Sequence, residues 1–276
     1  YLVRSVISEF SGFLLFKEIS NRLKKEGNRD LGKLFQFLAR DEARHAGFLS
    51  RALVAEGIEV DLPHLGGKRA ATWFPISWVI YSVYLSEKIG YWRYILMDRH
   101  LKANPGEAFA PLFDFFEPWC QDENRHGDCF TVMMRCWPGI TKGWRGKLLS
   151  RFFLWSVFLT HTLTVCERGE FYELLGIVPK EFDEEVIKRT NHTAKNAFPW
   201  VFNLEDNRFW DLRNNIIDAF RGFVSTKGIS KPVKFINFVS LIFQQFALPM
   251  EATNALRYDK DVNFTGGDIL NFWTDK

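Results

Sequence analysis

The pentapeptide DEARH at residues 41–45 decides the fold of this chain, because it recurs as DENRH at residues 122–126. Each copy contains Glu-x-x-His, and residues three apart lie on the same face of a helix. Glu42 and His45 therefore project together, and so does the corresponding pair of the second copy. Two such pairs on facing helices form half of a di-metal carboxylate site in a four-helix bundle, and the other half needs one Glu from each of two further helices.

Two upstream glutamates stand at matching distances from the two motifs. Glu9 lies 33 residues before Glu42, and Glu87 lies 36 residues before Glu123. Because a helix rises ~1.5 Å per residue and bundle loops are short, these spacings bring the carboxylates level on antiparallel helices of ~20–28 residues. The chain therefore contains two predicted helical hairpins that duplicate a metal half-site. The predicted ligands are Glu9, Glu42, His45, Glu87, Glu123 and His126.

The predicted donor set favours iron or manganese, because carboxylate oxygens and imidazole nitrogens do not suit the metals that prefer thiolates. Four carboxylates balance the charge of two divalent ions, so the loaded site can lie in a core where unpaired carboxylates would be costly. Asp41 and Asp122 precede the ligand glutamates, and we expect each to accept a hydrogen bond from the imidazole of the opposite hairpin. Arg44 and Arg125 are expected to pair with these aspartates.

A single Glu-x-x-His on a helix usually belongs to a solvated charged face, so the metal-site prediction depends on the duplication. Glu18 is a second acid of the first predicted helix, but it lies only 24 residues before Glu42, too few for a full-length hairpin. The stretch 73–86 before Glu87 contains no other acid. The upstream ligands are therefore assigned to Glu9 and Glu87.

The composition indicates one large domain, with 276 residues of which 47% are hydrophobic and 16% aromatic. The net charge of +3, without a basic run interleaved with aromatics, gives no reason to expect a nucleic-acid partner. Four cysteines without Cys-x-x-Cys spacing are read as free thiols. The remaining histidines are read as surface or satisfied core residues, although one of them could coordinate a metal carried by a substrate. They are His64, His100, His161 and His192.

The expected fold is all-α, and no stretch shows sustained β alternation. Residues 1–136 are predicted to form a ferritin-like four-helix bundle, 143–256 additional packing helices and 257–276 a polar tail, all within one domain, 1–276. The apolar stretch 152–165 is interrupted by His161, which favours a core or interfacial helix over a membrane span. The second expected helix is capped by Asp30 and ends at residue 56. The helix at 107–136 is expected to have a kink, or to consist of two abutting helices, at Pro118. The other expected helices are 1–26, 75–102, 143–174, 181–197, 207–226 and 231–256.

Several long blocks resemble the aerobic magnesium-protoporphyrin IX monomethyl ester oxidative cyclase family. The resemblance extends over most of the chain but not to its last ~40 residues. The blocks are SEFSGFLLFKE (8–18), RDEARHAGFL (40–49), YLSEKIGYWRY (84–94), FFEPWCQDENRHGD (115–128), FYELLGI (171–177) and KEFDEEVI (180–187).

The resemblance implies a di-iron monooxygenase-type oxidoreductase of chlorophyll or bacteriochlorophyll biosynthesis. It would use O2 to hydroxylate the 13-propionate methyl ester, oxidise it to a ketone and close the fifth, isocyclic ring of protochlorophyllide. The six predicted ligands would hold two Fe ions. An external ferredoxin-type electron donor is expected, because the sequence has no flavin, nicotinamide or Fe–S fingerprint. The resemblance also implies a small auxiliary subunit and peripheral association with the cytoplasmic side of a photosynthetic membrane, or its plastid equivalent.

A flat, apolar macrocycle would suit an aromatic-rich pocket, and part of the stretch at 73–92 is expected to line it. Three other classes of protein remain open on the residues alone. The first is a di-iron hydroxylase or desaturase of a lipid substrate. The second is a ferritin-like iron-binding protein, and the third is a structural bundle whose acids and histidines lie on its surface.

Overall fold

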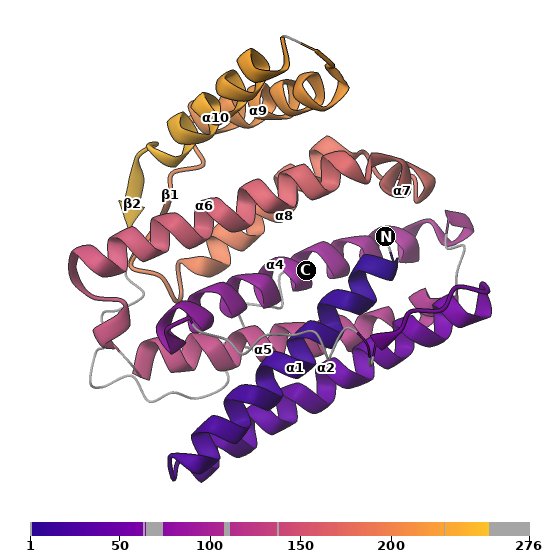
Figure 1. Ribbon diagram of the computed structural model, residues 1–276, viewed down its shortest axis with the longest axis vertical. Helices are drawn as coiled ribbons and strands as arrows, with labels where there is room; N and C mark the ends of the chain where they lie inside the picture. Colours follow the sequence, from indigo (N-terminus) through magenta and orange to yellow (C-terminus); the bar gives the residue numbers. More distant parts are fainter. Residues whose placement is uncertain are drawn as a thin grey trace.

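The chain is nearly all helical, as the sequence predicts. Its computed structural model arranges the helices in successive layers, from α1 and α2 at one side to α9 and α10 at the other (Figure 1). The predicted polar tail at 257–276 lies outside the described part of the chain. The structure describes residues 2–62, 64, 74–107, 111–136, 138–228 and 230–253.

The first two layers are a pair of helical hairpins. The helix α1 packs along α2, α4 packs along α5, and the two hairpins meet through α2 and α5. The bounds of these helices are Leu2–Lys25 for α1, Arg29–Ala55 for α2, Ile76–Ala103 for α4 and Phe116–Cys136 for α5.

The turn between α1 and α2 corrects one predicted cap. Gly27 has φ +85°, a conformation that glycine adopts without strain, and it ends α1. The second helix then begins two residues earlier than predicted, and Asn28 becomes the N-cap by accepting a hydrogen bond from the backbone N–H of Leu31. Asp30 lies in the first turn of α2 and does not cap the helix. Its negative charge there interacts favourably with the helix dipole.

The predicted helix at 107–136 is divided. Short 3-10 helices at Pro105–Glu107 and Pro111–Phe115 precede α5. Pro118 lies in the first turn of α5. Backbone N–H groups in the first turn of a helix have no intrahelical partner, so the N–H that proline lacks is not needed there. Of the two predicted alternatives, a kink or two abutting helices, the structure has the second.

The remaining layers consist of α6 (Gly143–Glu167), α7 (Gly169–Leu174), α8 (Pro179–Ala194), α9 (Asn207–Ser225) and α10 (Lys231–Phe246). The predicted single helix at 143–174 is wrong, because Arg168 leaves the helical conformation and α7 turns away from α6. This turn buries Tyr172, whose ring lies 4.9 Å from that of Phe182.

The all-α fold also contains one small antiparallel pairing that the sequence did not predict. Strand β1 (Trp200–Phe202) pairs with β2 (Met250–Ala252), with Val201 opposite Glu251. Three-residue strands are too short to show alternation in a sequence. The predicted helix at 231–256 ends early because Pro249 disfavours helical backbone in the residue before it.

Helix α6 is the one helix of the described residues that is long and apolar enough to cross a membrane, by length and composition alone. It contacts α4, α8 and α9, and 33% of its most apolar window is buried. The guanidinium of Arg151 donates hydrogen bonds to the carbonyls of Phe246 and Leu248, at 2.5 and 2.7 Å. These contacts tie α6 to the end of α10.

A buried charged cluster joins α6, α8 and α9. The carboxylate of Asp183 lies at its centre, and Nε of Arg213 donates a 2.7 Å hydrogen bond to Oδ2. The hydroxyl of Thr162 donates to the same oxygen at 2.9 Å, and Nδ1 of His161 lies 2.7 Å from Oδ1. Asp183 and Arg213 are each 1% exposed, so neither charge is stabilised by water and each depends on the other.

Candidate metal centre

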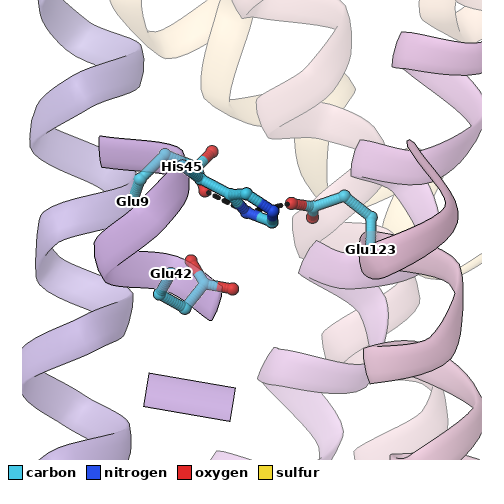
Figure 2. Close-up of side chains that lie close together, drawn as sticks. All are labelled: Glu9, Glu42, His45 and Glu123. Carbon is cyan, nitrogen blue, oxygen red and sulfur yellow. Dashed lines mark ion pairs between the residues drawn. The ribbon is translucent and has the colours of Figure 1, made fainter. Parts of the chain in front are cut away.

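The six predicted ligand residues come together between the two hairpins, and all are buried. Their ligand atoms fall into two groups whose members lie within 4.8 Å of one another. The first group, drawn in Figure 2, is Glu9, Glu42, His45 and Glu123, and the second is Glu42, Glu87 and His126.

Both groups contain residues of both hairpins. Glu123 of α5 completes the first group, while Glu42 of α2 belongs to both groups. A carboxylate has two oxygens and can therefore contact two ions at once. The arrangement can hold two neighbouring metal ions, with Glu42 shared between them.

The imidazole of His45 has one nitrogen facing the carboxylates and one facing outward. Its Nδ1 lies 3.2 Å from Oε1 of Glu123 and 3.5 Å from Oε2 of Glu9 (Figure 2). Its Nε2 lies 3.3 Å from Oδ2 of Asp122, on the opposite hairpin. Nδ1 is therefore the atom that could ligate a metal, and Asp122 is placed to hold the ring.

The imidazole of His126 is oriented in the same way. Its Nδ1 lies 3.1 Å from Oε1 of Glu42 and 3.3 Å from Oε2 of Glu87. Its Nε2 lies 3.6 Å from Oδ2 of Asp41, again on the opposite hairpin. The two hairpins thus exchange aspartates, an arrangement that orients ligating imidazoles in metal sites.

The two predicted arginines lie beside these aspartates but are not equivalent. The guanidinium of Arg44 lies 2.5 Å from Asp122 and 3.4 Å from Asp41, whereas that of Arg125 lies 3.2 Å from Asp122. Sequence reasoning missed Arg40, which lies 3.2 Å from Asp41. The His126 imidazole, followed by Arg40 and Arg44, lowers the pKa of Asp41 to about 2.

Burial and mutual repulsion keep protons on the ligand carboxylates. Burial, followed by the charge of Glu123, raises the pKa of Glu9 and raises that of Glu87 to about 7. Burial, together with Glu87 and Glu9, raises the pKa of Glu42 well above its usual range. The pKa of Glu123 is lowered despite burial, because His45 stabilises its charged form.

The same charges act on the two imidazoles in the opposite sense. Burial alone would lower the pKa of His45, but Asp122, Glu123 and Glu9 raise it to about 12. The pKa of His126 is likewise raised well above its usual value against the effect of burial. Without metal, protons therefore supply the positive charge that four close carboxylates require.

Buried atoms without hydrogen bonds show that the site fits metal ions. Oε1 of Glu42 and Nδ1 of His45 are fully buried and make no hydrogen bond within the described residues, although opposite charges lie nearby. Buried polar atoms without partners are rare and costly. Divalent cations between the two groups would satisfy both atoms.

Two glycines leave room for the carboxylates that cross between the hairpins. A Cβ on Gly12 would lie 2.9 Å from Oε2 of Glu42, and one on Gly90 would lie 3.3 Å from Oε2 of Glu123. Each glycine stands three residues after a ligand glutamate, in Glu-x-x-Gly. Sequence reasoning missed this repeated spacing, which was the available signal.

Gly12→Ala is expected to weaken iron binding by about 10–100-fold, because the added methyl group would displace the shared carboxylate of Glu42. Gly90→Ala should have a smaller effect, since its contact is longer. Gly47→Ala is the matched control, because a Cβ there meets nothing within 4 Å. Iron per chain after dialysis against a graded chelator measures the effect. Equal iron retention by Gly12→Ala and the control would contradict it.

Trp119 is a further residue that sequence reasoning missed. Its Nε1 donates a 2.8 Å hydrogen bond to Oε1 of Glu123, and its ring lies 5.1 Å from that of His45. Its spacing of four residues from Glu123 on one helix was the available signal. Trp119 holds one ligand carboxylate in place and covers one imidazole.

Binding of Fe(II) is expected to release protons. In the metal-free protein at pH 7 the raised pKa values keep His45 and His126 protonated, and each Nδ1 must lose its proton before it can ligate a metal. We expect about two protons per pair of ions from the imidazoles, and further protons from Glu42 and Glu87. The affinity should therefore rise with pH. Anaerobic titration of Fe(II) in a weakly buffered solution measures the release, and binding without acidification would contradict the expectation.

A cleft of about 310 Å³ adjoins the ligand carboxylates. One wall comes from α6, through Val157, Thr160, His161 and Thr164, and another from α4, through residues that include Arg93 and Tyr94. The stretch at 73–92 contributes Ser86, Glu87, Ile89 and Gly90 to this cleft, but none of the aromatic rings among its described residues, so the expected aromatic lining from this stretch is wrong. A larger cleft of about 670 Å³, on the side of α4 that faces α8, contains none of the six ligand residues.

Comparison with known families agrees with the geometry of the hairpins. A family model described as Rubrerythrin, a ferritin-like di-iron domain, matches residues 1–134. The match includes α1, α2, α4 and most of α5, and therefore all six ligand residues. It supports iron as the metal of this site.

Curated relatives match most of the chain. Magnesium-protoporphyrin IX monomethyl ester [oxidative] cyclase of Prochlorococcus marinus (strain MIT 9211) is 73% identical over 258 residues, which cover 94% of this chain and 74% of the relative. Cyclase 2 of Thermosynechococcus vestitus is 50% identical over 232 residues, covering 84% of this chain and 65% of the relative. No solved structure gives a significant match.

Proposed function

The chain belongs to the magnesium-protoporphyrin IX monomethyl ester oxidative cyclase family, and we propose that it is the oxygen-dependent di-iron enzyme that forms the isocyclic ring of protochlorophyllide. The proposal depends mainly on the 73% identity over 94% of the chain, together with the six buried ligand residues, which lie within the Rubrerythrin match. The enzyme is an oxidoreductase of chlorophyll biosynthesis. The relatives disfavour the alternatives of a lipid hydroxylase and of a ferritin-like storage protein.

The residues of the site have separable roles in this reaction. Two Fe ions, when bound, would supply the activation of O2 and the oxidation of an unreactive C–H bond. Glu9, His45 and Glu123 would hold one ion and Glu87 and His126 the other, and Glu42 belongs to both groups. The exchanged aspartates orient both imidazoles.

The cleft beside the ligands is the proposed entry of the substrate side chain. Its lining includes the carboxylates of Glu9, Glu42, Glu87 and Glu123, so a group inserted there lies next to the metal ligands. Arg93 lines the same cleft and is held over the ring of Tyr94 at 4.7 Å. A porphyrin monomethyl ester keeps one propionate as a free carboxylate, and Arg93 is placed to bind it.

Arg93→Gln is expected to weaken binding of the macrocycle about 10- to 100-fold, because a hydrogen-bonded charge pair contributes about 1.5–3 kcal/mol. Arg99→Gln, an exposed change on the same helix outside this cleft, is the control. The change in macrocycle absorbance on titration measures the dissociation constant. Equal affinities of the two variants would contradict a role of Arg93 in substrate binding.

We also propose a peripheral location on the cytoplasmic side of a photosynthetic membrane, or its plastid equivalent. Exposed apolar side chains on one face of α10 support it, namely Val233, Ile236 and Phe243, which are 66–68% exposed. The electrons would come from a ferredoxin-type donor, since the sequence has no Cys-x-x-Cys cluster motif. A small auxiliary subunit is the further proposed partner.

Iron content, combined with single-turnover absorbance, tests the function. The anaerobic protein receives Mg-protoporphyrin monomethyl ester and reductant, and then air. About two Fe per chain and a shift to a protochlorophyllide-like spectrum are expected. Two Fe with oxidation of an added acyl lipid and no reaction of the macrocycle would favour the lipid hydroxylase. Iron loading far above two per chain would favour the ferritin-like protein.

A further inference from the structure

His161 of α6 lines the same cleft as the metal ligands and is not one of them. It is 4% exposed, and the cleft also contains the ligand carboxylates of Glu9, Glu42, Glu87 and Glu123. Neither group of ligand atoms includes it. The cleft beside the candidate metal centre therefore has a buried imidazole in the wall that α6 contributes.

The two ring nitrogens of His161 differ in their surroundings. Nδ1 lies 2.7 Å from Oδ1 of Asp183, and Nε2 is buried without a hydrogen-bond partner among the described residues. A satisfied core histidine, as the sequence suggests, would have partners at both nitrogens. The structure corrects that reading, because only one side of the ring is satisfied.

Asp183 determines which nitrogen carries the proton. Its Oδ2 accepts hydrogen bonds from Arg213 and Thr162, which fix the direction of the carboxylate. Its Oδ1 accepts a hydrogen bond from Nδ1–H of His161, which leaves the lone pair of the neutral ring on Nε2. Burial, with Arg93 of α4 and Arg213 of α9, lowers the pKa of His161 and keeps the ring neutral, against the opposing effect of Asp183.

We propose that Nε2 of His161 is the general base that removes a proton from the substrate side chain during ring closure. The inference rests on the proposed function and deepens it. It assigns proton transfer to α6, which forms one wall of the cleft, whereas the metal ions are held by the bundle. Asp183 is a positioning residue in this proposal, because it acts only through the imidazole.

The chemistry of the substrate explains why a base is needed. Ring closure joins a side-chain carbon to a macrocycle carbon, so one C–H bond of the side chain and one of the macrocycle must break. Two protons are released, and the two electrons pass to the O2-dependent oxidant of the proposed activity. The hydrogen on the carbon beside the ester carbonyl is the most acidic, and more so once the next carbon is oxidised to a ketone. In the proposed step this C–H bond breaks, its electron pair stays on the substrate as an enolate, and the proton forms an N–H bond at Nε2. The imidazolium is stabilised by Asp183 and later returns the proton to water.

Coordination of the substrate magnesium is the other role open to a neutral imidazole. Mg²⁺ prefers oxygen ligands, which disfavours this role. An Asp-His pair is used in general-base catalysis and also to orient ligating imidazoles, so experiment must separate the two roles. The two roles predict different defects, because a lost axial ligand weakens binding, whereas a lost base slows ring closure after binding.

His161→Gln tests the proposal in the full chain, with His64→Gln as the matched control on an exposed residue. The glutamine amide can still donate to Asp183, but it has no basic nitrogen. We expect unchanged iron content and a macrocycle affinity within about threefold of the parent, with cyclised product formed about 10²–10⁴-fold more slowly. Oxygenated, uncyclised ester should accumulate, as mass spectrometry would show. Added imidazole should restore ring closure in His161→Ala, which removes the ring and leaves space for it.

Three results would overturn the inference. The first is a rate of ring closure in His161→Gln within about threefold of the parent, where a general base would contribute at least about 10²-fold. The second is weakened macrocycle binding with a normal rate of closure from the bound state, which would assign His161 to the magnesium. The third is loss of ring closure without accumulation of uncyclised ester and without rescue by imidazole, which would indicate a structural role. If the parent itself binds iron but does not convert the macrocycle, the proposed function fails, and the inference fails with it.

Discussion

Glu42→Ala is expected to remove bound iron and to reduce ring formation by more than about 10²-fold. Glu42 belongs to both groups of ligand atoms, so its loss affects both ions. Changes to residues that only orient the ligands already lower metal affinity or activity by about 10–100-fold, and removal of a shared ligand should lower them further. Iron per chain and single-turnover absorbance, measured on the same preparation, give both quantities.

The fold should survive the loss of Glu42, which separates this result from simple unfolding. In the metal-free protein the pKa of Glu42 is raised by burial and by the charges of Glu87 and Glu9. Removing one of the repelling carboxylates relieves part of that cost, so the metal-free variant should be at least as stable as the metal-free parent. Glu18→Ala, an acid on α1 outside the site, is the control and should keep its iron. Turnover and iron retained in Glu42→Ala would refute the site assignment.

Asp183→Asn is expected to lower the free energy of unfolding by about 3–5 kcal/mol. The substitution keeps the shape of the side chain but leaves the buried guanidinium of Arg213 without its counter-charge. A loss of this size corresponds to a fall in the melting temperature of roughly 10 °C for a chain of this length. Thermal and urea unfolding, followed by circular dichroism, measure the change.

Glu185→Gln is the matched control for Asp183→Asn on the same helix. Glu185 forms a solvent-exposed ion pair with Arg189 at 2.5 Å, and such pairs contribute at most about 1 kcal/mol. The control should therefore unfold close to the parent. If Asp183→Asn also unfolded at the temperature of the parent, the buried cluster would not hold α6, α8 and α9 together, and the orientation of His161 would need another explanation.

Sequence reasoning identified the parts of the protein that local periodicity controls. The ranges of α1, α2 and α4 were predicted to within a few residues, because glycines and prolines mark their ends. The six ligand residues were selected because Glu-x-x-His and its upstream glutamate recur with nearly equal spacing. The structure brings these six side chains together, and their role in binding iron stays a prediction until the metal is measured.

Other elements depend on contacts that have no local pattern. The pairing of β1 with β2 joins segments about 50 residues apart, and neither segment is long enough to alternate. The break between α6 and α7 follows from the burial of Tyr172 against a later helix. The N-cap was misassigned because the φ of Gly27 moved it from Asp30 to Asn28.

The sequence by itself determined the all-α class, the two hairpins and the set of buried ligand residues, because helical spacing alone decides which side chains share a face. Only the tertiary structure decided that α6 lies over the ligands and forms the second wall of a cleft. It also decided that His161 is held by an aspartate 22 residues away and an arginine 30 residues beyond that. The physical reason is that packing between distant helices decides whether a buried polar atom finds a hydrogen-bond partner. No local spacing in the chain encodes that packing.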